Sequence, residues 1–89
     1  MFSGGLEMLF ENKKALEIQV DSTFSMKDLI EELRVKYLKE KEEMFFTNGS
    51  VRPGIIVLIN DTDWELEETT AYKIQAGDRV AFISTLHGG

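Results

Sequence analysis

Residues 51–66 read VRPGIIVLINDTDWEL, and this stretch combines turns with strands. Its proline and glycine, Pro53 and Gly54, suit the two central positions of a type II turn. The next six residues, IIVLIN (55–60), form a continuous β-branched and aliphatic run, which predicts a strand in the interior of a sheet. DTDW (61–64) then turns the chain, and WELE (64–67) predicts a further short strand.

The last strand is predicted over residues 79–85, RVAFIST. Val80 and Phe82 lie on one face of this strand, and Ala81 and Ile83 lie on the other. Apolar residues on both faces indicate either an interior strand or a strand with a functional exposed face. The turn QAGD precedes it, so the C-terminal segment emerges directly from the sheet.

An earlier strand is predicted over residues 15–20, ALEIQV, because the pattern alternates. Leu16, Ile18 and Val20 face one way, and the polar residues between them face the other. Before it, LEMLF (6–10) fits either a short strand or a helical turn, and ENKK fits either a hairpin turn or a loop. Further on, MFF fits a short strand that leads into the turn TNGS.

The clearest single element is a helix predicted from Met26 to Glu40. Ser25 and Asp28 have the spacing of a capping box, and Phe24 and Leu29 have the spacing of a hydrophobic staple. Apolar residues recur on one stripe at Met26, Leu29, Ile30, Leu33 and Tyr37. We interpret a stripe this narrow as the face of a helix that packs on a sheet; the alternative is a helix that binds a partner protein. One helix on one mixed sheet predicts the α+β class.

Composition and net charge exclude some classes of function. The chain has 89 residues, enough for one small domain, and a net charge of -6 from 16 acidic and 10 basic residues. This charge argues against direct binding of nucleic acid or of anionic membranes. We also expect a cytoplasmic location, because no membrane helix or signal peptide is evident in the sequence. We expect the chain to be a monomer.

Residues able to carry catalysis are scarce. The chain has no cysteine and one histidine, His87, which lies near the C-terminus. Asp61, Asp63 and Glu65 have the spacing of the first calcium ligands of an EF-hand loop, but Leu66 replaces its glycine and Tyr72 its final glutamate. We therefore expect no catalytic residue, no metal site and no bound cofactor, and we interpret these acids as a solvated turn or a contact for a basic partner.

The ending TLHGG is the unusual feature. We predict a folded domain over residues 1–84 and a flexible tail over residues 85–89. Glycine at the last two positions, Gly88 and Gly89, removes every Cβ, so a tail of this kind can enter a narrow channel and leave its terminal carboxyl uncrowded. A carboxylate resists nucleophilic attack until it is activated, for example by adenylation with ATP. This predicts a substrate protein whose terminus reacts in another protein's active site.

Two segments also carry a resemblance to a known family. VRPGIIVLINDTDWEL and FISTLHGG resemble the eukaryotic ubiquitin-related modifiers, the sulfur-carrier branch of the ubiquitin-like proteins. GDRVAFISTLHGG is also similar to the bacterial-type carriers of molybdopterin and thiamin synthesis. The resemblance implies a β-grasp fold with one main helix packed on a mixed sheet. Family members begin with a longer alternating strand, so the first strand here is expected to be truncated, or LEMLF to replace it.

The resemblance also implies a function. Gly89 would be adenylated by an activating enzyme that uses ATP, and a persulfide from a rhodanese-type sulfur transfer would convert it to a thiocarboxylate. The sulfur would pass to enzymes that 2-thiolate wobble uridine in tRNA, and the chain would also be conjugated to lysines of target proteins. Gly88 would thread the enzyme's channel, and Leu86 and His87 would contact it.

Two other functions compete with the sulfur carrier. One is a non-covalent β-grasp binding module with an incidental Gly-Gly ending, and the other is the small subunit of a molybdopterin-type synthase. Candidate docking residues for an activating enzyme are Ala81 and Ile83 of the last strand. Acidic side chains that could complement a basic enzyme surface are Asp61, Asp63, Glu65 and Glu67.

Overall fold

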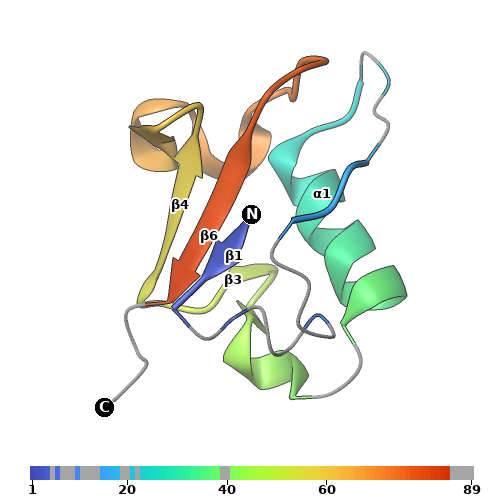
Figure 1. Ribbon diagram of the computed structural model, residues 1–89, viewed down its shortest axis with the longest axis vertical. Coiled ribbons are helices and arrows are strands. Elements are labelled where there is room, and N and C mark those ends of the chain that lie inside the picture. Colours follow the sequence, from blue (N-terminus) through green and yellow to red (C-terminus); the bar gives the residue numbers. More distant parts are fainter. Residues whose placement is uncertain are drawn as a thin grey trace.

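The computed structural model describes residues 1–4, 6, 10, 15–18, 21, 23–38 and 41–84. Four strands form one sheet in the order β1-β6-β4-β5, and helix α1 (Met26–Glu32) lies over one face of this sheet (Figure 1). The strands are β1 (Phe2–Ser3), β4 (Ile55–Ile59), β5 (Thr62–Asp63) and β6 (Val80–Ser84). The predicted α+β class and mixed sheet are confirmed.

The centre of the sheet is the antiparallel pair of β4 and β6, which the apolar runs predicted. Five residues pair along each strand, from Ile55 opposite Ser84 to Ile59 opposite Val80. On β4 every second side chain is buried, so the strand sends one face toward α1 and the other away from it. The prediction of an interior strand is confirmed, because β6 lies on one side of β4 and β5 on the other.

Strand β1 consists of two residues and pairs in parallel with β6, Phe2 opposite Phe82 and Ser3 opposite Ile83. The amide of Phe82 donates to the Met1 carbonyl at 2.7 Å. The expectation of a short first strand therefore holds. Of LEMLF, the structure describes Leu6 and Phe10, which are buried and lie outside every strand, while residues 7–9 lie outside the described residues.

The start of the helix follows from its capping residues. The Ser25 side chain accepts from the amide of Asp28, and the Asp28 carboxylate accepts from the amide of Ser25, so the predicted capping box is present. The helical stretch continues as a π-turn over Leu33–Tyr37, closed by the Leu38 amide donating to the Leu33 carbonyl at 2.8 Å. The prediction that the helix reaches Glu40 is wrong, because Leu38 adopts an extended conformation and packs against the core.

Two other short elements also differ from the prediction. MFF is only partly a strand, since Glu42–Met44 form a 3-10 helix and strand β2 is Phe46–Thr47. Strand β2 pairs with β3 (Ser50–Val51) around the predicted turn. WELE is not a strand: Trp64–Leu66 form a 3-10 helix, because Asp63 caps the amide of Glu65 and Trp64 turns into the core. A further 3-10 helix is Thr69–Ala71.

The predicted strand over residues 15–20 is absent from the part that the structure describes, residues 15–18. The alternation itself is real, because Leu16 and Ile18 are half-buried while Ala15 and Glu17 are exposed. Residues 15–18 form no hydrogen bond to another described residue, so no sheet pairing supports a strand there. Residues 19 and 20 of the predicted strand lie outside the described residues.

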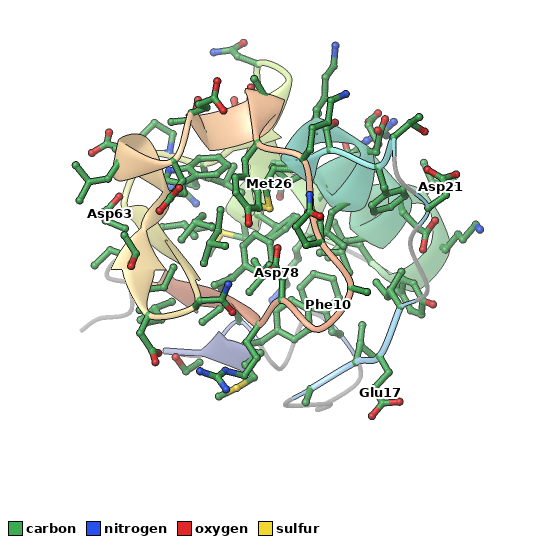
Figure 2. All side chains as sticks on the ribbon, turned by 90° about the horizontal axis from the view of Figure 1, so that it is seen from above. Phe10, Glu17, Asp21, Met26, Asp63 and Asp78 are labelled. Atoms are coloured by element: carbon green, nitrogen blue, oxygen red, sulfur yellow. The ribbon has the colours of Figure 1, made fainter. Side chains whose placement is uncertain are left out.

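The core between α1 and the sheet is built around four phenylalanines, Phe2, Phe10, Phe45 and Phe82. The Phe2 and Phe10 rings stack at 4.1 Å between centroids, and Phe45 meets both Phe10 and Phe82 edge-on, at 5.3 and 5.5 Å. Met26 fills the space from the helix side, as Figure 2 shows. Aromatic pairs of this geometry add about 0.5–1.5 kcal/mol each beyond their burial. This core fixes β6, which leads into the C-terminal segment.

Candidate functional site

The last described residue of β6, Ser84, is held from both sides. It lies opposite Ile55 of β4, and its neighbour Ile83 lies opposite Ser3 of β1. Gly4 passes against the backbone of Ser84 with a φ of +69°, and a Cβ on Gly4 would collide with the Ser84 carbonyl oxygen. Glycine is needed here both for its conformation and for this close approach. The C-terminal segment therefore starts from a fixed point.

The predicted site residues Leu86, His87, Gly88 and Gly89 belong to residues 85–89, which lie outside the described residues. Their predicted roles, and the predicted tail itself, stay predictions. The structure instead defines the surroundings from which that segment departs, namely the outer face of the sheet, an acidic loop and a polar cluster at the other end of β6.

The outer face of the sheet, opposite α1, carries four apolar residues in cross-strand register. Ile56 lies opposite Ile83, and Leu58 lies opposite Ala81. Ile56 is 39% exposed, and the other three are half-buried. Predicted docking residues Ala81 and Ile83 are therefore part of a continuous apolar surface, to which β4 contributes equally. We call these four residues the outer sheet face.

The acidic residues of the predicted partner contact lie around β5, next to the outer sheet face. Asp63 pairs with Leu58 across the two strands, and its carboxylate accepts from the amide of Glu65 at 2.9 Å. Asp61 lies 3.6 Å from the guanidinium of Arg79. Glu67 follows the 3-10 helix and is half-buried. Among the described residues, no group of three or more acidic or histidine side chains is placed to hold a metal ion.

Asp78, which the sequence pattern placed only in a turn, is the centre of a polar cluster before β6 (Figure 2). Its carboxylate accepts from the Tyr72 hydroxyl at 2.8 Å, the Gln75 amide at 2.8 Å and the Asn60 side chain at 2.9 Å. The Asn60 side chain also accepts from the Arg79 amide at 2.9 Å. One carboxylate therefore ties the turn after β4 and the segment around Tyr72 to the start of β6.

The hydrogen bonds of this cluster change the pKa of both Asp78 and Tyr72. Desolvation raises the pKa of Asp78, but the hydrogen bonds from Gln75, Asn60 and Tyr72 outweigh it and leave the pKa below its usual value. The hydrogen bond to Asp78, with desolvation and the nearby charge, raises the pKa of Tyr72 to about 12. The sequence QAGD indicated only a turn at Asp78. Nothing in the sequence indicated that Asn60 and Tyr72 contact this residue.

One helix packed on a mixed sheet, with the last strand internal and leading into the C-terminal segment, defines a β-grasp domain of the ubiquitin-like class. None of the described helices is long and apolar enough to cross a membrane. The chain belongs to the family described as Urm1 (Ubiquitin related modifier), whose family model matches residues 1–89. Both the predicted family and the predicted fold are confirmed.

Relatives of this chain are similar over nearly their whole length. The "Ubiquitin-related modifier 1 homolog" of Dictyostelium discoideum is 51% identical over 89 residues, covering 98% of this chain and 93% of the relative. The "Ubiquitin-related modifier 1" of Gallus gallus is 46% identical over 91 residues, covering 99% and 90%. The solution structure of Urm1 from Trypanosoma brucei superposes with a TM-score of 0.85 at 37% identity, covering 99% of this chain and 90% of that one.

Proposed function

We propose that this chain is a sulfur carrier and protein modifier whose reacting group is the C-terminal carboxyl of Gly89. The observation that carries the proposal is membership of the ubiquitin-related modifier family by a chain that ends in Gly88-Gly89. The chain acts as a protein substrate in this proposal, and a separate ATP-dependent enzyme supplies the chemistry. We place this reaction in the cytoplasm.

The position of β6 supports this proposal. Ser84 is fixed in the sheet, and five residues follow it. Five residues span at most roughly 18 Å when fully extended, at about 3.3–3.6 Å each. A carboxyl group on such a tether reaches a catalytic centre that lies well away from the domain surface. The folded domain then provides the surface that the enzyme binds.

The chemistry proceeds in three balanced steps. The Gly89 carboxylate attacks the α-phosphorus of ATP and releases pyrophosphate, which gives an acyl-adenylate. The terminal sulfur of an enzyme persulfide attacks the acyl carbon, and AMP leaves. A second enzyme thiol then attacks the resulting S–S bond, forming an enzyme disulfide and releasing the thiocarboxylate. The chain has no cysteine, so every thiol that takes part in these three steps belongs to the enzyme.

The outer sheet face is the docking surface for the activating enzyme in this proposal. Its apolar residues lie beside the fixed start of the tail, and acidic Asp61, Asp63 and Glu65 are exposed next to it. An apolar centre with a charged edge is the usual arrangement of a protein interface. The acidic edge complements a basic enzyme surface and increases the rate of encounter.

The thiocarboxylate then has two fates in this proposal. Its sulfur passes to tRNA thiolation enzymes for 2-thiolation of wobble uridine, without direct contact between this chain and the tRNA. The activated terminus is also attacked by lysine amines of target proteins, which forms an amide bond and releases the sulfur. Both reactions use the same uncrowded acyl carbon of Gly89.

ATP–pyrophosphate exchange with the activating enzyme tests this proposal. We expect exchange with the natural chain, and none when one alanine is added after Gly89. We expect Ile56→Asp to raise the KM for the chain at least tenfold, which corresponds to about 1.4 kcal/mol of lost binding. Val35→Asp is the matched control, because Val35 is 67% exposed and lies on the helical stretch away from the outer sheet face.

The result also separates the competing functions. A non-covalent binding module would give no exchange, and its partner would tolerate the added alanine. A small subunit of a molybdopterin-type synthase would give exchange but would donate its sulfur only when the large catalytic subunit of that synthase is present. Exchange that is insensitive to the added alanine would contradict the proposal that Gly89 reacts.

A further inference from the structure

The hairpin of β2 and β3 turns through two residues, Asn48 and Gly49. Thr47 pairs with Ser50 on either side of them, so no other residue takes part in the turn. Both turn residues are exposed and have positive φ angles, +48° for Asn48 and +81° for Gly49. Positive φ at both positions is typical of a type I′ turn, and asparagine followed by glycine is a pair that adopts it readily.

The same pair of residues is chemically reactive. Asparagine is a labile residue, because the backbone nitrogen of the next residue can attack its side-chain Cγ and close a five-membered ring. The attack is intramolecular, so it needs no enzyme once the two atoms meet. Glycine has no Cβ to obstruct this approach. A Cβ built on Gly49 would meet no atom within 4 Å, so the space around the attacking residue is open.

The Asn48 side chain is free to take part in this attack. It is exposed and forms no hydrogen bond within the part of the chain that the structure describes. The base of the hairpin is held by the Arg52 amide, which donates to the Phe45 carbonyl at 2.8 Å. The pairing of β2 with β3 comprises two residues on each strand, and so short a hairpin opens more readily than a larger sheet. The tip can therefore open while the base stays in place.

Asn60 is an internal comparison, because it occupies the equivalent place in the turn between β4 and β5. Asn60 and Asp61 also have positive φ angles, +51° and +68°. The Asn60 side chain, however, donates to the Asp78 carboxylate at 2.9 Å and accepts from the Arg79 amide at 2.9 Å. The two asparagines therefore differ in the restraint on the side chain and in the residue that follows.

We propose that Asn48 is a site of covalent modification at which the chain itself supplies the nucleophile. The Gly49 nitrogen loses its proton and attacks the Asn48 Cγ, and the side-chain nitrogen takes up a proton and leaves as ammonia, which gives a succinimide. Water then opens the ring. Attack of water at Cγ gives aspartate, and attack at the main-chain carbonyl gives isoaspartate, whose peptide bond runs through Cγ. This reaction is independent of the function proposed for Gly89.

Isoaspartate at position 48 changes both the turn and its chemistry. It adds one carbon to the backbone of a two-residue turn, so the pairing of β2 with β3 weakens. Phe46 and Val51 pair across this hairpin and pack against the core, and they lose part of that contact. The main-chain carboxylate is now free. It is the group that an isoaspartate-specific carboxyl methyltransferase accepts, with S-adenosylmethionine as the methyl donor.

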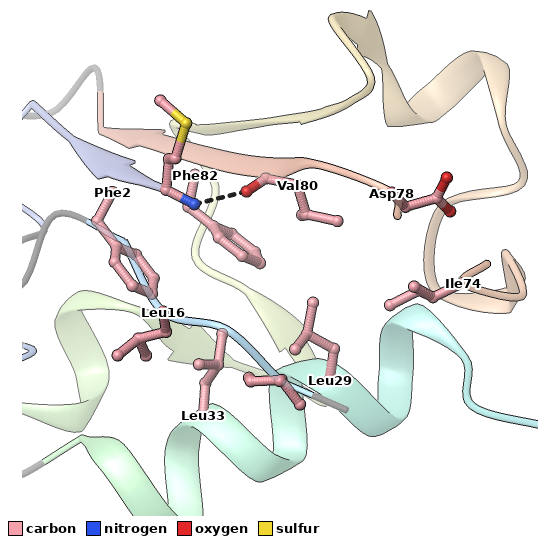
Figure 3. Close-up of a pocket in the computed structure, with 10 residues that line it drawn as sticks. Phe2, Leu16, Leu29, Leu33, Ile74, Asp78, Val80 and Phe82 are labelled. Atoms are coloured by element: carbon pink, nitrogen blue, oxygen red, sulfur yellow. Dashed lines mark hydrogen bonds between the residues drawn. The ribbon is translucent and has the colours of Figure 1, made fainter. Parts of the chain in front are cut away.

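The effect of the modification stays local to the hairpin. The apolar space of about 100 Å³ between β6 and α1 is lined by Leu29, Leu33 and Phe82, whose side chains Figure 3 shows. None of residues 46–51 lines this space. The packing of α1 on the sheet is therefore kept when the hairpin changes.

The test compares the full chain with the capped synthetic peptide FTNGSV, which has the sequence of residues 46–51. Both are incubated in the same buffer, and mass spectrometry after digestion at acidic pH locates each side-chain amide that has become a carboxyl. We expect Asn48 in the folded chain to convert at a rate within about tenfold of the peptide, since only the tip must open. We expect Asn60 to convert at least tenfold more slowly than Asn48. The rate should rise with pH, because the attacking nitrogen must lose its proton.

Isoaspartate is detected separately by transfer of a labelled methyl group from S-adenosylmethionine to the incubated chain. We expect this label on position 48 and none on an Asn48→Gln chain, since glutamine would have to form a six-membered ring. The isoaspartate form, separated by ion exchange, should melt at a lower temperature than the natural chain. Asn48→Asp should melt closer to the natural chain, because it adds the charge without the extra backbone carbon. The comparison of Asn48 with Asn60 needs no variant, so it stays decisive if Asn48→Gln fails to fold.

Several results would overturn the proposal. These are an intact Asn48 after the peptide has converted, equal rates at Asn48 and Asn60, conversion only when urea unfolds the chain, or an incubated chain that accepts no methyl group. The first and third results would show that the folded turn protects Asn48, which would then have a structural role alone.

Discussion

Asp78 is a single residue whose hydrogen bonds join three segments, and its effect is measurable in solution. In a Tyr37→Phe background, Tyr72 is the only tyrosine left of the two in the chain. We expect its pKa, measured by absorbance of the phenolate, to be about 12 instead of the usual 10.0. Asp78→Asn should move it toward 10, because the carboxylate no longer opposes the phenolate. Asp63→Asn removes an exposed acid elsewhere and should leave the pKa of Tyr72 unchanged.

The sign of the pH dependence follows from the same two shifts. The raised pKa of Tyr72 stabilises the fold fully below pH 10, and this contribution is lost as the pH rises toward 12. The lowered pKa of Asp78 stabilises the fold above its ordinary value of 3.8 and is lost as the pH falls through its folded value. An identical free energy of unfolding at pH 9 and pH 12 for the natural chain would contradict the hydrogen bond between Tyr72 and Asp78.

Sequence reasoning at the residue scale succeeded where the partners are close in the chain. Ser25 and Asp28 are three residues apart, and the turn at Pro53 and Gly54 is closed by neighbours, so local chemistry was sufficient. Asp78 was missed because Asn60 lies 18 positions away. A contact of that separation depends on the register of β4 and β6, which no local pattern specifies.

At the scale of an element, the capping box of α1 is directly testable. Ser25→Ala removes the acceptor for the Asp28 amide, and we expect it to cost about 1 kcal/mol of unfolding free energy. For a domain of this size that equals a fall of roughly 4–8 °C in Tm by calorimetry. Ser25→Thr keeps a hydroxyl acceptor and should recover most of the loss. Equal melting temperatures for Ser25→Ala and the natural chain would contradict the cap.

The junction of β1 with β6 depends on Gly4. Gly4→Ala places a Cβ against the backbone of Ser84 at a positive φ, whereas Gly49→Ala has a positive φ of +81° and open space. We expect Gly49→Ala to cost about 1–2 kcal/mol from its conformation alone. Gly4→Ala should cost a further 1–3 kcal/mol or so from overpacking. Urea unfolding of both variants measures the difference, and equal losses would show that the approach of Gly4 to Ser84 is loose.

Helices and strands could be predicted where the pattern of their own residues is sufficient to specify them. The apolar stripe gave α1, and the aliphatic runs gave β4 and β6. Residues 15–18 of the predicted strand 15–20 keep the alternation of burial but pair with no described strand, and alternation alone does not specify a partner. The strand over residues 64–67 failed because Asp63 caps a 3-10 turn that buries Trp64, and alternation over four residues does not distinguish the two.

At the scale of the whole molecule, we propose a rigid domain that carries a reacting C-terminus. The phenylalanine core and the polar cluster around Asp78 hold β6, and β6 presents the outer sheet face beside Ser84. The family and the fold class could be predicted from two sequence segments, because both the turn–strand block and the Gly-Gly ending are local. The polar cluster around Asp78 could not be predicted, because its members come from different segments of the chain.

Formation of the thiocarboxylate tests most directly whether the C-terminal carboxyl of Gly89 is the reacting group. The full chain is incubated with its activating enzyme, ATP and a persulfide sulfur donor, and its intact mass is then measured. We expect the mass change of one oxygen replaced by sulfur, located on Gly89 by fragmentation and absent when ATP is omitted. An unchanged mass, under conditions in which a relative from the same family is converted, would contradict the claim that the C-terminal carboxyl is the reacting group.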